Sequence, residues 1–204
     1  MKLLAADFVT SAAPSSRTVP RDGLAHVAFA GRSNVGKSSL LNALCRRSIA
    51  RTSAAPGKTR LANIYRVSAE GGIGGPGRWS CYFTDLPGYG YARGGGNAAE
   101  ELRRVAEAYF AAAPDATVLL LVDSRHPGLD LDRQAVDWLD AIGMPRRIVA
   151  TKVDKLSRAE RAKNLRELEG IFGTAALPVS AADGEGLDEL WKLIASLARA
   201  EKQR

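Results

Sequence analysis

The chain has 204 residues, of which 46% are hydrophobic and 25% are charged. This length fits one domain with a full core, and the composition excludes a disordered chain. The two cysteines, Cys45 and Cys81, lie far apart in the sequence, so we predict neither a disulfide framework nor a metal cluster. The net charge of +7 favours a polyanionic partner, although a basic surface that only aids solubility is the alternative.

The N-terminal residues 1–23 read as an extension ahead of the main domain, which spans residues 24–204. A short apolar piece, Phe8-Val9-Thr10, is expected to add an edge strand. Asp7 interrupts the first apolar residues before a signal-peptide core forms, and no later run has the length of a membrane span. We therefore expect a cytoplasmic protein with no membrane partner.

The apolar run Leu24–Ala30 has the pattern of a buried parallel strand. Residues 31–38 then read G-R-S-N-V-G-K-S, which matches the phosphate-binding motif G-x-x-x-x-G-K-[ST], and a helix is predicted from Lys37 to about Arg47. Glycines let several backbone N–H groups face a polyphosphate, and the lysine reaches its outer phosphates. The helix N-terminus adds a positive dipole. The motif therefore predicts a nucleotide site.

The middle of the chain predicts a hairpin, from Leu61–Ser68 and Trp79–Thr84, which follows a polar loop over residues 48–60. Further strands are predicted at Thr117–Val122, Arg147–Ala150 and Ala176–Val179, with helices between them and at the C-terminus. This alternation predicts an α/β fold with a single, mostly parallel central sheet, one antiparallel edge strand and helices on both faces. Ligands of such folds bind at the carboxyl ends of the strands.

A second motif, Asp85-Leu86-Pro87-Gly88, directly follows a predicted strand. Asp85 suits a carboxylate that holds Mg²⁺ through water, and Gly88 can turn its N–H toward a γ phosphate. Ser38 and Thr59 are expected to give Mg²⁺ a hydroxyl each. Loops that contact the γ phosphate would be ordered when a triphosphate is bound and released when a diphosphate is bound. We therefore expect a molecular switch.

The base is indicated by Thr151-Lys152-Val153-Asp154. A carboxylate at Asp154 can accept two hydrogen bonds from guanine, whereas adenine would leave it unpaired. The stem of Lys152 is expected to lie against the purine, and the N–H of Ala181, after Ser180, to meet guanine O6. ATP-dependent chemistry is the disfavoured alternative.

These motifs together resemble the small GTPase superfamily, and most closely its EngB (YihA/YsxC) branch of bacterial ribosome-assembly GTPases. The resemblance covers residues from about 6 to 200, with specific pieces at residues 31–40, 56–60, 85–92 and 151–155. It implies a GTP-binding domain over residues 24–204, GTP and Mg²⁺ binding, association with the ribosomal RNA and proteins of the large subunit, and a link to cell division and septation. A scaffold at the division site with incidental hydrolysis is the alternative function.

The residues expected to bind nucleotide are then Gly31, Arg32, Ser33, Asn34, Val35, Gly36, Lys37, Ser38, Ser39, Gly57, Lys58, Thr59, Asp85, Leu86, Pro87, Gly88, Thr151, Lys152, Asp154, Ser180 and Ala181. Those expected to act in hydrolysis are Lys37, Thr59 and Gly88. Mg²⁺ is expected on Ser38 and Thr59, and on Asp85 through water.

Two departures from the superfamily pattern matter. Thr151 stands where asparagine is usual, and we expect this to change the tethering of the phosphate loop rather than base choice. Tyr89 stands where many small GTPases have the glutamine that orients the attacking water, so slow intrinsic hydrolysis is predicted. Asn34 resembles the asparagine that holds K⁺ in potassium-activated GTPases, and an asparagine that only fills the loop is the alternative.

Two basic clusters are candidates for RNA contact. The first is near Thr59 and the second is on a predicted later helix, where interleaved glutamates favour an ordinary solvated face. The clusters contain Arg46, Arg47, Arg51, Lys58 and Arg60, and Lys155, Arg158, Arg161, Lys163 and Arg166. No coiled-coil repeat demands a dimer, and we expect a monomer.

Overall fold

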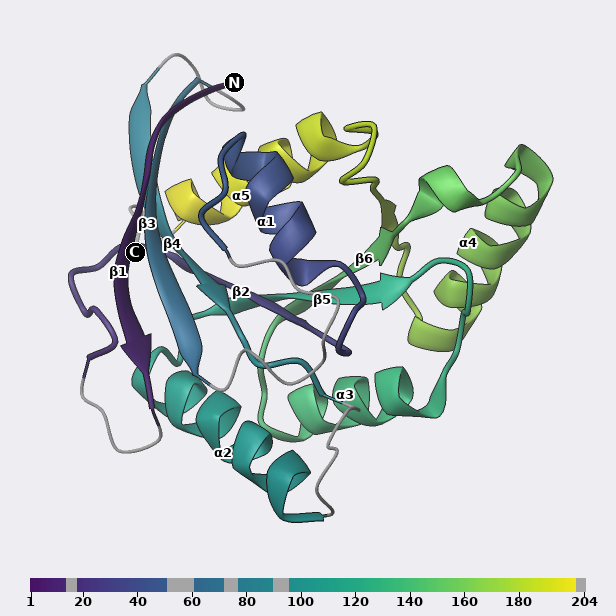
Figure 1. Ribbon diagram of the computed structural model, residues 1–204, viewed down its shortest axis with the longest axis horizontal. Coiled ribbons are helices and arrows are strands. Elements are labelled where there is room, and N and C mark those ends of the chain that lie inside the picture. The colour runs from purple at the N-terminus through teal and green to yellow at the C-terminus, as the bar shows by residue number, and fades with distance from the viewer. Residues whose placement is uncertain (14–17, 51–60, 72–76, 90–95, 201–204) are drawn as a thin grey trace.

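The structure is a computed structural model that describes residues 1–13, 18–50, 61–71, 77–89 and 96–200. Its described residues form one seven-stranded sheet in the order β1-β3-β4-β2-β5-β6-β7 (Figure 1). The strands are β1 (Lys2–Ala12), β2 (His26–Gly31), β3 (Ala62–Glu70), β4 (Arg78–Asp85), β5 (Thr117–Asp123), β6 (Arg146–Thr151) and β7 (Leu177–Pro178).

Five neighbouring strands, from β4 through β2, β5 and β6 to β7, run parallel. The predicted hairpin is β3 and β4, which pair antiparallel from Asn63 opposite Asp85 to Glu70 opposite Arg78. The N-terminal strand β1 pairs antiparallel with β3 on its other side, with Phe8 opposite Tyr65. The predicted α/β fold class is confirmed, and β1 forms the outer edge that the apolar piece around Phe8 indicated.

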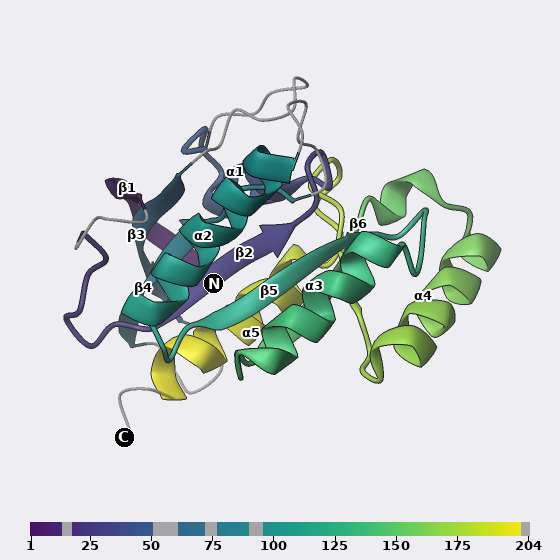
Figure 2. The same cartoon turned by 90° about the horizontal axis from the view of Figure 1, so that it is seen from below.

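Helices cover both faces of the sheet. In Figure 1, α1 and α5 lie on one face and α2 and α3 on the other, and Figure 2 shows the second face from below. The helices are α1 (Lys37–Cys45), α2 (Gly96–Ala112), α3 (Asp130–Ala141), α4 (Arg158–Phe172) and α5 (Leu187–Ala200), with a short 3-10 turn at Val153–Lys155.

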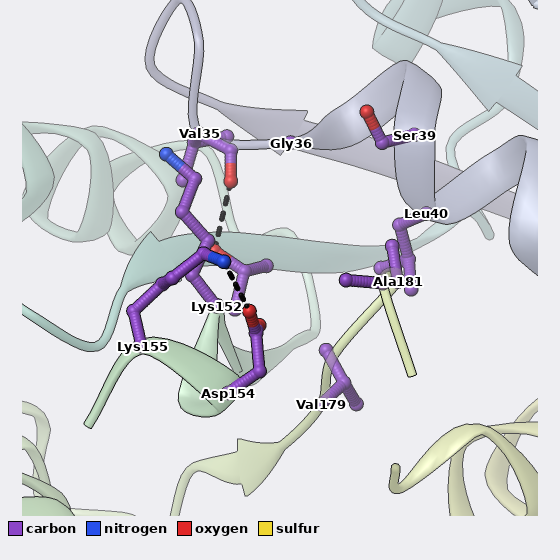
Figure 3. Close-up of a pocket in the computed structure, with 11 residues that line it drawn as sticks. Val35, Gly36, Ser39, Leu40, Lys152, Asp154, Lys155, Val179 and Ala181 are labelled. Atoms are coloured by element: carbon purple, nitrogen blue, oxygen red, sulfur yellow. Dashed lines mark hydrogen bonds and ion pairs between the residues drawn. The ribbon is translucent and has the colours of Figure 1, made fainter. Parts of the chain in front are cut away.

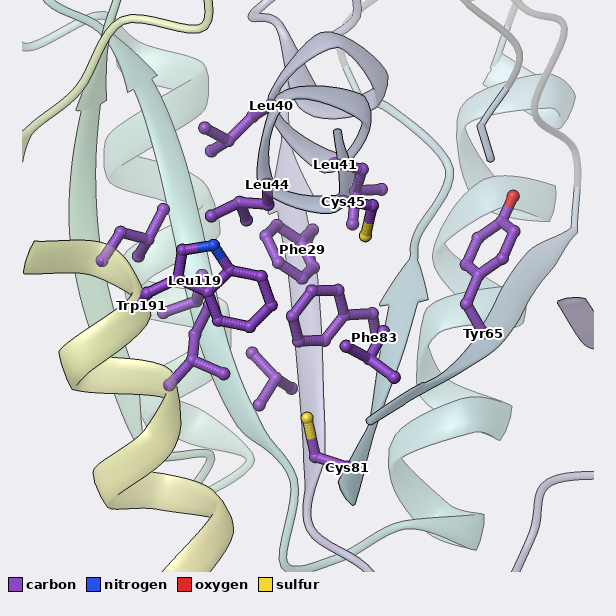
Figure 4. Close-up of a cluster of buried hydrophobic side chains, with 14 of the residues drawn as sticks. Phe29, Leu40, Leu41, Leu44, Cys45, Tyr65, Cys81, Phe83, Leu119 and Trp191 are labelled. Carbon is purple, nitrogen blue, oxygen red and sulfur yellow. The ribbon is translucent and has the colours of Figure 1, made fainter. Parts of the chain in front are cut away.

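The central strands alternate between two buried faces, which explains why their sequences are apolar throughout. On β2, Phe29 packs in the core under α1 and α5, while its neighbours Ala28 and Ala30 face the core under α2 and α3. The first core is aromatic at its centre, because Phe83 lies 5.1 Å from Phe29 and 5.7 Å from Trp191 between ring centroids (Figure 4). This packing fixes the strand ends that carry the site.

Helix α4 has the capping box that its sequence predicts. The Ser157 side chain accepts a hydrogen bond from the Glu160 backbone, and the Glu160 carboxylate accepts one from the Ser157 N–H at 2.9 Å. The helix ends at Phe172, because Gly173 takes the left-handed conformation of a C-cap. None of the helices in the described ranges is long and apolar enough to cross a membrane.

Candidate nucleotide-binding site

The phosphate loop joins the end of β2 to the first residue of α1, as predicted. Gly31 and Gly36 have φ values of 152° and 110°, which side chains with a Cβ rarely adopt. A Cβ on Gly31 would lie 2.7 Å from the carbonyl oxygen of Leu121 on β5 and 2.9 Å from Val35 Cγ1. The loop therefore requires glycine at its start, because the neighbouring strand passes directly behind it.

Lys37 lies in the floor of the loop, with only 8% of its surface exposed. Its ammonium donates to the carbonyl oxygens of Gly31, at 2.9 Å, and Arg32, at 3.1 Å. Burial lowers the pKa of Lys37 to about 8, against an opposing effect of Asp85. A buried cation with this few anionic neighbours is placed to gain strongly from a phosphate.

Asp85 ends β4 beside the start of α1 and is 2% exposed. Its Oδ2 accepts a hydrogen bond from the Ser38 hydroxyl at 3.3 Å, whereas its Oδ1 is buried and has no partner among the described residues. Burial raises the pKa of Asp85 to about 6, because the charged form is poorly solvated. An unpartnered carboxylate oxygen next to a hydroxyl fits Mg²⁺, which takes oxygen ligands and keeps bound waters.

Residues 86–89 lie across the phosphate loop. The Ser33 N–H donates to the Tyr89 carbonyl at 2.9 Å, and the Ser33 hydroxyl donates to the Gly88 carbonyl at 3.3 Å. A Cβ on Gly88 would come within 2.9 Å of both Lys37 Nζ and Ser33. Gly88 is thus close enough to the loop for its backbone to share a ligand with Lys37. Leu86 places its side chain in the core, so only its backbone is near the site.

A cavity of about 380 Å³ lies between the phosphate loop and the ends of β6 and β7 (Figure 3). A volume of this size suits a small ligand. Eleven residues line it: Val35, Gly36, Ser39, Leu40, Thr151, Lys152, Asp154, Lys155, Val179, Ala181 and Ala182. The structure therefore brings the predicted base-recognition residues to one side of the phosphate loop.

The carboxylate of Asp154 lines this cavity and is held from two directions. Lys155 Nζ lies 2.9 Å from Oδ2, and the Ser180 hydroxyl donates to Oδ1 at 2.9 Å. The hydrogen bonds from Lys155 and Ser180 lower the pKa of Asp154, so it is ionised at neutral pH. An oriented, charged carboxylate is what two guanine N–H donors require. Sequence reasoning had not placed Ser180 in this supporting role.

Thr151 connects the base side of the cavity to the phosphate loop. Its buried hydroxyl lies 2.8 Å from the Val35 carbonyl and 3.1 Å from the Val122 carbonyl. A hydroxyl has one proton, so it donates mainly to the nearer oxygen, that of Val35. Thr151 thus tethers the phosphate loop through its hydroxyl.

Lys152 provides a second connection. It has a left-handed φ of 62°, and its ammonium donates to the Asn34 carbonyl at 2.7 Å and to Asp123 Oδ2 at 2.9 Å. Burial alone would raise the pKa of Asp123, but hydrogen bonds from Arg125 and Lys152 hold it well below its usual range. Sequence reasoning had not selected Asp123, although its place at the end of β5 was a usable signal.

Asp132, on the first turn of α3, is another residue that sequence reasoning missed. It contacts Arg32 on the phosphate loop and the Tyr89 hydroxyl. Three predicted site residues, Gly57, Lys58 and Thr59, lie outside the described residues. The other predicted residues belong to the phosphate loop and the start of α1, to the end of β4 and the segment after it, or to the cavity wall, except Ser180, which contacts Asp154 without lining the cavity.

A mostly parallel sheet with a phosphate loop after β2, a buried aspartate at the end of β4 and a cavity beside the loop is the arrangement of a P-loop GTPase. Residues 26–152 match the family model described as 50S ribosome-binding GTPase. The chain is 43% identical over 194 residues to the probable GTP-binding protein EngB of Chlorobaculum parvum, which covers 93% of this chain and 95% of that protein. It is 44% identical over 178 residues to the Thermotoga maritima EngB, covering 85% and 86%. The chain therefore belongs to the EngB family and is a GTPase.

Solved structures share this fold. A crystal structure of a probable GTP-binding protein EngB superposes with a TM-score of 0.62, over 86% of this chain and all of that one, and at 22% identity it shows the fold. Aquifex aeolicus Era, solved with GDP and AlF4⁻, gives a TM-score of 0.67 at 26% identity, over 85% of this chain and 56% of that one. Era has also been solved with MgGDPNP and nucleotides 1506–1542 of 16S ribosomal RNA, with a TM-score of 0.66 at 26% identity over the same shares of the two chains.

Proposed function

We propose that this GTPase is a slow molecular switch that times a step in the assembly of the large ribosomal subunit. Cell division and septation would then depend on it through that step. The observation that carries the proposal is the match of residues 26–152 to a family described by its binding to the 50S ribosome. In this proposal the protein acts in the cytoplasm as a monomer, and the division-site scaffold is the competing outcome.

In this proposal the nucleotide lies with its base in the cavity and its phosphates along the phosphate loop. Guanine occupies the cavity against Asp154, with the Lys152 stem on its face and the Ala181 N–H at its O6. The phosphates lie along residues 31–38, with the outermost at Lys37 and Gly88. The close approach of Gly88, Ser33 and Lys37, and the solved complexes of Era with GDP and GDPNP, support this placement.

Mg²⁺ is assigned to Ser38 and, through water, to Asp85, with Thr59 as a further hydroxyl ligand. When bound, the cation neutralises charge on the β and γ phosphates during hydrolysis. The Oδ1 of Asp85, which has no partner among the residues that the structure describes, supports this assignment. K⁺ is assigned beside Asn34, whose left-handed φ of 63° shapes the loop there, and would supply positive charge that Tyr89 cannot.

Slow hydrolysis follows from the residue after Gly88. Tyr89 directs its hydroxyl to Asp132 at 3.0 Å, so that side chain is engaged away from an attacking water. No other described side chain of this segment stands in for the usual glutamine. Acceleration is therefore expected from K⁺ or from a ribosomal component.

The RNA-contacting face is assigned first to the cluster near Thr59. Of its members, Arg46 and Arg47 are described, and both are exposed and without an ion pair to any described residue. On α4, Arg158, Lys163 and Arg166 are likewise exposed and unpaired among the described residues, whereas Lys155 pairs with Asp154 and Arg161 with Glu185. Cations that are not used internally are free to displace counterions from RNA.

Salt-titrated co-sedimentation with large ribosomal subunits tests the proposal, using protein loaded with GDP or with a non-hydrolysable GTP analogue. We expect binding that prefers the GTP analogue and weakens as salt rises. The double variant Arg46→Glu/Arg47→Glu should weaken binding and flatten the salt dependence. Arg103→Glu/Arg104→Glu on α2 makes the same change in charge, is exposed, and should behave as wild type. Absence of binding in both nucleotide states would favour the division-site scaffold.

A further inference from the structure

A closed ring of hydrogen bonds joins the phosphate loop, α3 and the segment after β4. Asp132 accepts from Arg32 Nε at 3.1 and 3.2 Å and from the Tyr89 hydroxyl at 3.0 Å. The ring closes through the backbone, because Ser33, next to Arg32, donates its N–H to the Tyr89 carbonyl at 2.9 Å. Tyr89 is thus held at both its side chain and its backbone.

Asp132 links the other side chains of this ring, because its carboxylate accepts hydrogen bonds from both Arg32 and Tyr89. Its side chain is 1% exposed, against 21% for Arg32, and it receives hydrogen bonds from both partners. It lies in the first turn of α3, where the helix dipole favours a negative charge. A buried carboxylate with a cation and a hydroxyl as donors is a strong and directional anchor.

The ring meets the phosphate loop at the end away from the base. Val35 and Gly36 line the base cavity, whereas Ser33 contacts residues 88 and 89. In the nucleotide placement proposed above, only the last phosphate reaches Ser33 and Gly88. The Tyr89 carbonyl and a third phosphate therefore compete for the same Ser33 N–H, while a diphosphate leaves that hydrogen bond in place.

We propose that Asp132 is a positioning residue that holds Tyr89 against the phosphate loop and so makes the site prefer the diphosphate to the triphosphate. This inference rests on the nucleotide placement assigned above, and it does not depend on the ribosomal partner. Binding of the third phosphate breaks the Ser33–Tyr89 hydrogen bond and releases Tyr89 from Asp132. Binding of GTP therefore costs the free energy of these two hydrogen bonds, whereas binding of GDP does not.

Tyr89→Phe tests the proposal, because it removes the hydroxyl and keeps the ring. The affinities of the variant and wild type for GDP and for a non-hydrolysable GTP analogue are measured by calorimetry in Mg²⁺ buffer. The free energy of one hydrogen bond to a charged group changes an equilibrium constant by about tenfold. Because this hydrogen bond is expected to oppose the triphosphate, we expect Tyr89→Phe to bind the analogue about tenfold more tightly than wild type. GDP affinity should be unchanged. Asp132→Asn, which keeps the side-chain size and removes the charge, should shift the ratio in the same direction.

Tyr82→Phe is the matched control. The Tyr82 hydroxyl also donates to an aspartate, Asp22, at 2.8 Å, but Tyr82 is on β4 opposite His26, at the start of β2 and away from the loop. Both tyrosine variants should lose similar thermal stability, and only Tyr89→Phe should change the GDP-to-analogue ratio. An unchanged ratio in Tyr89→Phe and Asp132→Asn, or a shift toward GDP, would overturn the proposal. Failure of wild type to bind either nucleotide would overturn the site assignment itself.

Discussion

The Thr151 hydroxyl lies 2.8 Å from the carbonyl oxygen of Val35, although the two residues are 116 positions apart in the sequence. One is in the base-recognition motif and the other is in the phosphate loop. This hydrogen bond is buried, so the wall of the base cavity and the loop that holds the phosphates are mechanically joined. In the proposed site, this hydrogen bond couples the placement of the base to that of the phosphates.

Thr151→Val tests this coupling. The variant keeps the shape of the side chain and leaves the buried Val35 carbonyl without its donor, which typically costs about 1–3 kcal/mol. We expect that loss in the free energy of unfolding by chemical denaturation, together with weaker GDP binding. Thr151→Ser retains the hydroxyl and should stay close to wild type in GDP affinity. Equal GDP affinity in the valine variant would show that the tether does not support the site.

Asp85→Asn is expected to stabilise the nucleotide-free protein while impairing Mg²⁺-dependent binding. Folding raises the pKa of Asp85 from 3.8 to about 6, so between these values the native state binds more protons than the unfolded state. The stability that this carboxyl supports in its protonated form is therefore complete below pH 4 and is lost as the pH rises through 6. A permanently neutral asparagine avoids that loss.

At pH 7 we expect Asp85→Asn to raise the free energy of unfolding by on the order of 1 kcal/mol. The difference from wild type should vanish near pH 4, where the aspartate is protonated. Nucleotide affinity of the variant should respond less to Mg²⁺ than that of wild type, because the water-mediated contact is lost while the proposed hydroxyl ligands remain. Denaturant titrations at several pH values, with EDTA present, measure the first effect. If Asp85→Asn were less stable than wild type at pH 7, that result would contradict the proposal that the buried, charged Asp85 carboxylate destabilises the nucleotide-free protein.

Potassium is expected to accelerate hydrolysis. If K⁺ beside Asn34 supplies the positive charge that Tyr89 lacks, GTP turnover should be faster in KCl than in NaCl at equal ionic strength. Asn34→Gly, which keeps the left-handed backbone without strain, should remove that difference, and its rate in NaCl should remain near that of wild type. Phosphate release under single-turnover conditions is the measurement. Equal rates of the unmodified protein in the two salts would exclude K⁺ activation.

Most of the fold could be predicted from the sequence because its signals are local. The strand that ends at Gly31, the helix that starts at Lys37 and the capping box at Ser157 each depend on neighbouring residues. The positions of Lys37 and Asp154 could also be predicted, since the motif spacing places Lys37 at the start of α1 and Asp154 just after β6, whereas their roles in binding stay predictions. The β1 edge was foreseen from the short apolar piece around Phe8.

Contacts between distant segments could not be predicted in the same way. Asp132 is 100 positions from Arg32 and 43 from Tyr89, and its sequence neighbourhood is that of an ordinary acidic helix start. The pair of Asp123 and Lys152 likewise forms only because β5 and β6 are adjacent in the sheet. Side chains that support a site through the fold leave no short motif, so only the structure reveals them.

Competition between GTP and other nucleoside triphosphates tests the assignment of the guanine site most directly. Wild type, with the Asp154 carboxylate facing the cavity, should bind GTP at least about 10⁴-fold more tightly than ATP, because adenine offers no donors to that carboxylate. Asp154→Asn turns one acceptor into a donor, so it should lose GTP affinity and gain affinity for xanthosine triphosphate, whose 2-oxo group accepts. Unchanged preference for GTP in Asp154→Asn, or equal binding of ATP and GTP by wild type, would contradict the assignment of this cavity as the guanine site.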